Sequence, residues 1–260
     1  MCASSLAEVE SAWSLVYRRY TQTGLIADNP YGLHASPTAV GPHACVIWGP
    51  DGANVGYTMT LFRDNPLGLA LDSVYRPYLD QLRDQGRQLL EVGMLADRRE
   101  VAARGMKALF NMMRWAIYFG LHTGVTDIMI GVHPRHAAFY TRCYGFEEFA
   151  PPTTYALVRD NPVVLLRLRL HEGLAKDVLP RGLADARDNP VPRSAFSSRF
   201  GFLPEQLYGS RIAAFLKDRH GIEQRIETNG LLLPSLMPVL KNPDTVNAES
   251  SNDVAILVEA

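Results

Sequence analysis

The stretch TDIMIGVHPRHAAFYTRCYGF, residues 126–146, decides the fold of this chain. Its apolar run over 128–132 predicts a buried strand, which stops at His133-Pro134. Proline suits the first turn of a helix, where its missing N–H is not needed, and Gly145 suits the left-handed position beyond a helix end. The segment therefore predicts a strand, a short helix that ends at Gly145, and the start of another strand.

Two faces of this short helix carry different side chains. His136 and Tyr140 are four residues apart and share one face, whereas Phe139 and Cys143 share another. Phe139 is a core residue by default, and tyrosines with a satisfied hydroxyl are common in protein interiors. The segment alone therefore leaves open whether Tyr140 is a core or a catalytic residue, and whether His136 is a surface residue.

Outside this segment, helical and strand patterns alternate along the chain. Helical periodicity covers 6–20, 72–85 and 104–122, and strand patterns cover 43–48, 56–62, 89–95, 155–158 and 163–170. On the longest helix, the predicted core face is Met106, Leu109, Phe110, Met113, Ala116, Ile117 and Leu121. The order of elements predicts an α/β fold, a mixed sheet with helices on both faces.

The regular alternation of helical and strand patterns ends after residue 171. Prolines interrupt the pattern, and one amphipathic helix is predicted over 208–220. We therefore expect a first domain over 1–171 and a C-terminal extension over 172–260, of unknown role and partly loop or disordered.

Composition excludes several classes of protein. Of the 260 residues 47% are apolar, which is enough for a full core, and the net charge of −1 argues against a nucleic-acid binder. The three cysteines share no metal-ligand spacing, so we expect free thiols in a reducing compartment and no metal site. No signal peptide or membrane-spanning stretch is apparent, so the sequence predicts a cytoplasmic protein with no integral membrane segment.

A charge stands inside the predicted strand over 89–95. Glu91 is flanked by apolar residues, and burying an unpaired carboxylate costs several kcal/mol. Glu91 is therefore either a water-facing residue of an edge strand or a buried group with a chemical role.

Cationic side chains are dense over residues 98–114. Five of them stand against Glu100, for a net charge of 5 − 1 = +4: Arg98, Arg99, Arg104, Lys107 and Arg114. Such charges are usually a solvated helix face, but beside a thioester site they would also attract an acidic carrier protein.

These segments together resemble the FeeM-type long-chain N-acyl amino acid synthases, which are GNAT-type acyltransferases related to the autoinducer synthases. The resemblance covers about residues 8–170, and its best pieces are the Glu91-Val92 strand and the run from His133 to Phe146. The chain departs from coenzyme-A-using GNATs because Arg104-Gly105 is all that remains of their pyrophosphate turn. It departs from autoinducer synthases at Met94, near which they carry an arginine.

The resemblance implies a GNAT-like mixed, mostly antiparallel sheet and an N-acyltransferase. It would move a long-chain fatty acyl group from an acyl carrier protein thioester to the α-amino group of a free amino acid, giving a lipid-like product. The co-substrate would be an acyl-phosphopantetheine thioester on acyl carrier protein, with acyl-CoA as the alternative, and no cofactor would be bound. The amino acid, the acyl length and the oligomeric state stay open.

The resemblance also implies site residues. Glu91 is expected as the base or ammonium anchor, with His133 second, and Tyr140 as the proton donor to the departing thiolate. The backbone N–H of Met94 or Leu95 would hold the carbonyl oxygen. Substrate-binding candidates are Arg87, Arg135, His136 and Tyr17, and docking candidates are Arg98, Arg99, Arg104 and Lys107. The strands at Glu91 and 128–132, expected as the fourth and fifth, should splay apart.

Three other functions remain open from the sequence. The first is an autoinducer-type acyl-homoserine-lactone synthase, and the second is an acetyl-CoA-dependent GNAT N-acetyltransferase. The third is a catalytically inactive GNAT fold that serves as a sensor or scaffold. The methionines Met112, Met113 and Met129 are core by default, although flexible Met also suits an acyl tunnel.

Overall fold

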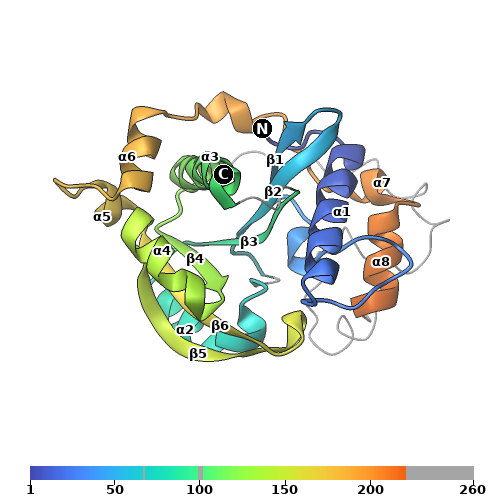
Figure 1. The fold of residues 1–260 in the computed structure, drawn as a ribbon, viewed down its shortest axis with the longest axis horizontal. Helices are drawn as coiled ribbons and strands as arrows, with labels where there is room; N and C mark the ends of the chain where they lie inside the picture. The colour runs from blue at the N-terminus through green and yellow to red at the C-terminus, as the bar shows by residue number, and fades with distance from the viewer. Residues whose placement is uncertain (67, 99–101, 221–260) are drawn as a thin grey trace, which may run out of the picture.

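Six strands form one sheet within the residues that the computed structural model describes, 1–66, 68–98 and 102–220 (Figure 1). In order across the sheet they are β1 (Ala44–Asp51), β2 (Asn54–Arg63), β3 (Leu89–Asp97), β4 (Asp127–Val132), β6 (Asn161–Arg169) and β5 (Glu147–Tyr155). β3 and β4 pair in parallel, and the other neighbouring pairs are antiparallel. The predicted mixed, mostly antiparallel sheet is confirmed.

Helices cover both faces of this sheet, as predicted. The apolar residues of α1 (Leu6–Gln22) and α2 (Asp72–Asp84) enter one buried core, and those of α3 (Ala102–His122) and α4 (Pro134–Tyr144) enter the other. Figure 1 shows α1 and α3 on opposite sides of the strands. The predicted ends of α4 are confirmed, because Pro134 opens it and Gly145 follows it with φ of +76°.

The parallel pair β3 and β4 separates part-way along its length. Pairing runs from Leu89↔Asp127 to Glu91↔Met129 and stops there, although β3 continues to Asp97 and β4 to Val132. The predicted splay at Glu91 is confirmed, but these strands are the third and fourth of the chain rather than the fourth and fifth. The separation leaves room for a site beyond Glu91.

One local prediction was wrong, and another was wrong in part. The strand expected over 155–158 is a 3-10 turn at Ala156–Val158, and the strand before it is Glu147–Tyr155. Arg159 and Asp160 both have positive φ, so the chain reverses immediately after the turn.

The core face predicted for the long helix α3 is confirmed at Met113, Ala116 and Ile117, which are buried, but it was wrong at one end and incomplete. Met106 is 40% exposed, whereas Met112 and Phe119 are buried. Phe119 packs against Phe196, which lies in the segment after the sheet. That segment covers a second side of α3, so periodicity for one buried face could not identify it.

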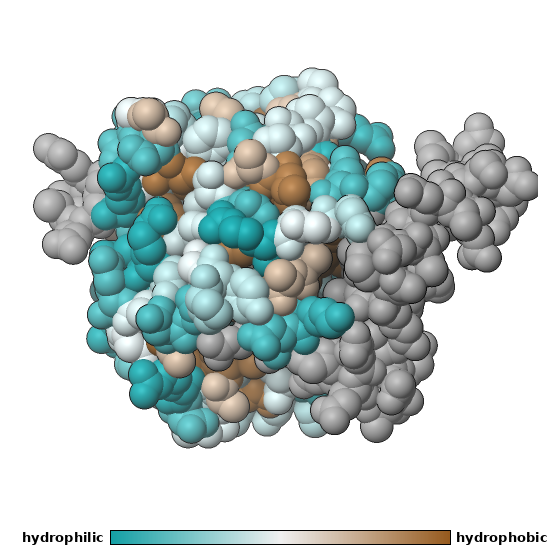
Figure 2. Space-filling view, turned by 90° about the vertical axis from the view of Figure 1, so that its right-hand side faces the viewer, coloured by the Kyte–Doolittle hydropathy of each residue, from teal (hydrophilic) through white to brown (hydrophobic). Residues whose placement is uncertain are grey.

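Residues 172–220 pack on both sides of the sheet domain. They include the end of α5 (Leu170–Leu174) and the whole of α6 (Arg181–Asp188), η3 (Arg193–Phe196), α7 (Pro204–Leu207) and α8 (Arg211–His220). On one side Phe196 contacts Trp115, and on the other Phe202 stacks on Trp13. On the face with α1 and α8, apolar side chains surface in small patches between polar ones (Figure 2). The rest of the expected extension lies outside the described residues.

The chain's N-terminal residues add to the edge of the sheet. Cys2 forms an isolated antiparallel β-bridge with Ile47 of β1, and the buried sulfur atoms of Cys2 and Cys45 are 3.4 Å apart. All three cysteines are free thiols. Among the described residues, no helix is long and apolar enough to span a membrane.

Candidate active site

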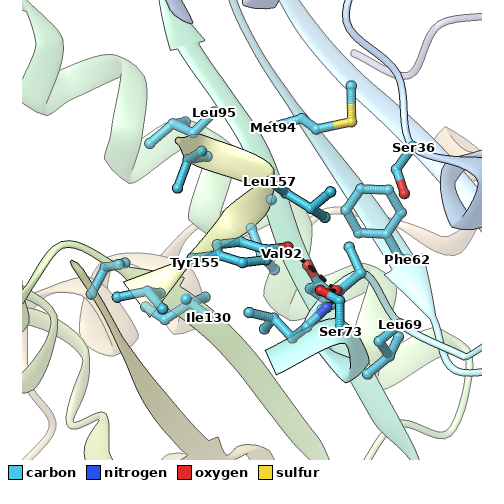
Figure 3. A pocket seen from close by; sticks show the side chains of 18 of the residues that line it. Ser36, Phe62, Leu69, Ser73, Val92, Met94, Leu95, Ile130, Tyr155 and Leu157 are labelled. Atoms are coloured by element: carbon cyan, nitrogen blue, oxygen red, sulfur yellow. Dashed lines mark hydrogen bonds between the residues drawn. The ribbon is translucent and has the colours of Figure 1, made fainter. Parts of the chain in front are cut away.

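A cavity of about 1270 Å³ opens where β3 and β4 separate. Apolar side chains from several elements form most of its walls, among them Phe62 of β2, Met94 of β3, Ile130 of β4 and Leu157 of the β5–β6 turn (Figure 3). A volume of this size exceeds that of typical drug-sized pockets, which reach roughly 1000 Å³. The cavity can therefore hold a long apolar group beside a polar one.

Glu91 lies at the point where the strands part. Its side chain is 5% exposed and lines the cavity, and its Oε2 accepts a hydrogen bond of 3.0 Å from the Leu71 amide. Burial raises the pKa of Glu91 from its ordinary value of 4.5 to about 8. The Leu71 amide opposes this rise, whereas Asp72 and Asp64 add to it. A carboxyl group with this pKa can accept a proton near neutral pH.

Three tyrosines surround the same cavity. Tyr140 of α4 is 8% exposed, and burial raises the pKa of its phenol to about 12. Burial likewise raises the pKa of Tyr20 of α1 to about 12, and Tyr140 and Glu91 contribute to that rise. Tyr155 of β5 donates a 3.3 Å hydrogen bond to the Ala70 carbonyl (Figure 3 shows its position). All three phenols are therefore protonated at neutral pH.

Two histidines and an arginine lie at the N-terminal end of α4. His133, Arg135 and His136 line the cavity. The Nε of Arg135 donates to His136 Nε2 at 3.1 Å, and burial lowers the pKa of His136, with help from Arg135. His136 is therefore neutral at physiological pH, and the Arg135 guanidinium keeps donors for an anionic group.

β3 is irregular directly beyond Glu91. Met94 has φ of +51°, an uncommon value for a residue with a side chain, and the register with β2 shifts between Thr58 and Thr60. This is a β-bulge, which re-aims backbone groups locally. Met94 and Leu95 both line the cavity.

A family model described as N-acyl amino acid synthase FeeM matches residues 11–169. The matched stretch is more than half of the chain and contains the sheet, Glu91 and α4. The chain belongs to the FeeM family. It is an acyltransferase.

Solved structures agree with this family in fold. FeeM, an N-acyl amino acid synthase from uncultured soil microbes, is 24% identical with a TM-score of 0.57, over 66% of this chain and 90% of that one. TofI, solved with an inhibitor and MTA, is 11% identical with a TM-score of 0.52, over 72% and 95%. No curated protein sequence matches. The mixed α/β fold expected from the sequence is thus shared with these structures.

Two expected substrate-binding residues of this FeeM-family chain lie away from the cavity. Arg87 donates to buried Asp127 through Nε at 2.5 Å and Nη2 at 3.1 Å, at the far end of β4 from the opening. Tyr17 donates its hydroxyl to Asp28 and does not line the cavity. Both contacts hold the fold together, so neither residue is carried into our mechanism.

The expected docking residues are placed only in part. Arg98 and Lys107 are exposed and lie outside the cavity lining. Arg99 and the side chain of Arg104 lie outside the described residues. Among the described residues, no group of three or more His, Cys, Asp or Glu side chains could hold a metal ion.

Sequence reasoning missed Tyr20 and Tyr155. Tyr20 is in the first helix and Tyr155 ends β5, so 135 residues separate them along the chain. Nothing local distinguishes them from core tyrosines. Tyr20 ends the helical pattern expected over 6–20, and that pattern alone gives it no role other than packing.

Proposed function

We propose that this FeeM-family acyltransferase moves a long-chain acyl group from an acyl carrier protein thioester to the α-amino group of an amino acid. The observation that carries the proposal is the buried Glu91 carboxyl group in a large cavity with apolar walls. An acyl chain suits those walls, and a basic carboxylate suits an ammonium group that must lose a proton.

The reaction needs a base, a polarised carbonyl and a leaving thiol. Glu91 accepts a proton from the acceptor ammonium, whose pKa lies near 8, and the neutral amine attacks the thioester carbonyl. The developing oxyanion is held by a backbone N–H at Met94 or Leu95, in the bulge. The C–N bond forms, the C–S bond breaks, and the second amine proton passes through His133 or water to solvent.

Tyr140 serves the departing thiolate. Its phenol is protonated at neutral pH because burial raises its pKa to about 12, so it donates a hydrogen bond to the sulfur. Arg135 is the residue that we assign to the acceptor carboxylate, because it lines the cavity and a guanidinium matches a carboxylate in shape.

The Tyr140→Phe substitution is expected to lower turnover at least tenfold, about 1.4 kcal/mol of transition-state stabilisation. Removing the hydroxyl leaves the thiolate without its donor, while the ring packing on Phe146 is retained. Initial rates of thiol release measure the effect. The matched control is Tyr144→Phe on the same helix, since Tyr144 is buried outside the cavity and its hydroxyl has no hydrogen-bond partner among the described residues. Equal rates for the two variants would remove Tyr140 from the chemistry.

The assignment of acyl carrier protein as the acyl donor is tested by reversing the charge of two exposed cations. Arg98→Glu with Lys107→Glu should raise the apparent KM for acyl carrier protein severalfold and flatten its salt dependence, because surface charges steer association over roughly 8–10 Å. The rate with a short acyl-pantetheine donor should not change, since it has no protein surface to steer. The control pair is Lys176→Glu with Arg187→Glu, two exposed cations in the region of α5 and α6.

Two results would contradict the donor assignment. Equal losses with both donors would mean that Arg98 and Lys107 serve the site or the fold. Efficient use of long-chain acyl-CoA with no response to carrier protein would point to coenzyme A instead. The product is identified by mass spectrometry of lipid extracts from expressing cells. Long-chain N-acyl amino acids should exceed the vector control, and their absence from an active, folded preparation would overturn the acceptor assignment.

A further inference from the structure

Arg83 stands at the centre of an ion cluster in the wall of the cavity, which Asp72, Asp80 and Arg83 itself line. Its guanidinium donates to Asp64 from Nε at 2.6 Å and Nη2 at 3.0 Å. It donates to Asp72 from Nη1 at 2.7 Å and Nη2 at 2.8 Å, and Nη1 also reaches Asp80 at 2.6 Å. Asp72 is 8% exposed and both its oxygens are occupied, because Oδ2 also accepts from the Leu69 amide at 2.7 Å. Both carboxylate oxygens of Asp72 and of Asp64 are therefore occupied within the cluster.

The cluster holds the backbone that touches Glu91. Asp64 follows β2, and its amide donates to the Leu89 carbonyl of β3 at 2.9 Å. Asp72 begins α2, directly after Leu71, whose amide donates to Glu91. Arg83 thus fixes both ends of the stretch that presents the Leu71 amide to the carboxyl group.

The cluster also carries charge. Three carboxylates face one guanidinium, so the net formal charge of the cluster is −2. Two of the carboxylates, Asp72 and Asp64, raise the pKa of Glu91. From other elements, the titratable or charged groups that share the cavity with Glu91 are Tyr20, His34, Arg76, His133, Arg135, His136, Tyr140 and Tyr155. A like charge disfavours ionisation of a carboxyl group, and an opposite charge favours it. Because Arg83 is ion-paired with both Asp64 and Asp72, it opposes the charge of the two carboxylates that act on Glu91.

We propose that Arg83 is a positioning residue for Glu91: by holding Asp64 and Asp72 it keeps the Leu71 amide on the carboxyl group and sets the pH at which that group ionises. This rests on the proposed function only where it concerns the rate, since ionisation of Glu91 can be measured without turnover.

Removing the positive charge of the cluster and removing one of its negative charges should shift the ionisation pH of Glu91 in opposite directions. Arg83→Met leaves the three carboxylates unopposed, so Glu91 should ionise about one pH unit higher. Asp72→Asn removes one negative charge, so Glu91 should ionise at lower pH by a similar amount. Arg83→Lys keeps the charge but loses the fork that spans two carboxylates, and a smaller upward movement is expected. A residue that only supported the fold would not give shifts of opposite sign.

The experiment is a pH titration of the full chain carrying ¹³C-labelled glutamate carboxyl groups, followed by NMR. The Glu91 signal is the one that Glu91→Gln removes. Each variant is first checked by circular dichroism and thermal unfolding, and Arg83→Lys provides the test if Arg83→Met does not fold. The matched controls are Arg187→Met and Asp188→Asn, an exposed ion pair of α6 whose loss should leave the titration unchanged.

The outcomes separate the proposal from the proposed function. If the Glu91 titration shifts in opposite directions in Arg83→Met and Asp72→Asn, and the acidic limb of the pH–rate profile shifts with it, both the proposal and the proposed function are supported. Opposite shifts with no change in the pH–rate profile support control of ionisation by Arg83 but overturn Glu91 as the base. An unchanged Glu91 titration in folded Arg83 and Asp72 variants overturns the proposal, whatever the rate does.

Discussion

Turnover of the Glu91→Gln variant should fall at least tenfold, which corresponds to about 1.4 kcal/mol of transition-state stabilisation. Glutamine resembles the protonated carboxyl group in shape but cannot accept the ammonium proton. The base acts in its ionised form, and its pKa is about 8, so the wild-type rate should rise as the pH rises through about 8. Initial rates from pH 6 to pH 9.5 measure both effects, and the variant should lose this limb of the profile.

The matched control for this prediction is Glu148→Gln. Glu148 is an exposed residue of β5 outside the cavity, so its replacement should leave both the rate and its pH dependence unchanged. A Glu91→Gln variant with near-normal turnover and an unaltered profile would transfer the role of base to His133 or to water.

The Asp127→Asn substitution should lower the free energy of unfolding by about 3–5 kcal/mol. Asp127 is fully buried and accepts hydrogen bonds from Arg167 Nε at 2.7 Å, Arg87 Nε at 2.5 Å and Thr126 Oγ1 at 2.6 Å. Burial alone would raise the pKa of Asp127, but these donors outweigh it and hold the pKa below its usual value. Asparagine would leave the Arg167 side chain, which is 8% exposed, without its buried counter-ion.

Urea unfolding followed by circular dichroism measures this loss. The control is Asp177→Asn, because Asp177 is exposed in the segment after α5, and its unfolding midpoint should not move. Because a lowered pKa stabilises the folded state above the unfolded pKa, the contribution of Asp127 should also disappear as the pH falls through its folded pKa. An equally stable Asp127→Asn variant would show that the two arginines find water or other partners.

Local signals predicted most of the sheet and part of the site. Pro134 and Gly145 mark the ends of α4 by backbone chemistry that acts within a few residues. Glu91 was conspicuous because a charge interrupts an apolar strand, and the parting of β3 and β4 explains how it can be buried there.

The remaining features depend on distant parts of the chain. A segment that begins about fifty residues after α3 ends covers a second side of this helix, so periodicity for one buried face could not show that Phe119 is also buried. Arg83 lies on a helix like many exposed arginines, and its role emerges only when Asp64 and Asp72 converge on it. Such contacts depend on tertiary structure, so local secondary-structure propensities do not predict them.

The burial of Glu91 has a thermodynamic consequence. Its pKa rises from 4.5 in the unfolded chain to about 8 in the folded one, so between these values the folded protein retains a proton that the unfolded chain has released. Folding then becomes less favourable as the pH increases across this window, by an upper limit of about 5 kcal/mol for this group. The pH change that ionises the base therefore also removes its contribution to folding, so the Glu91→Gln variant should lose less stability than the wild type as the pH rises from 6 to 9.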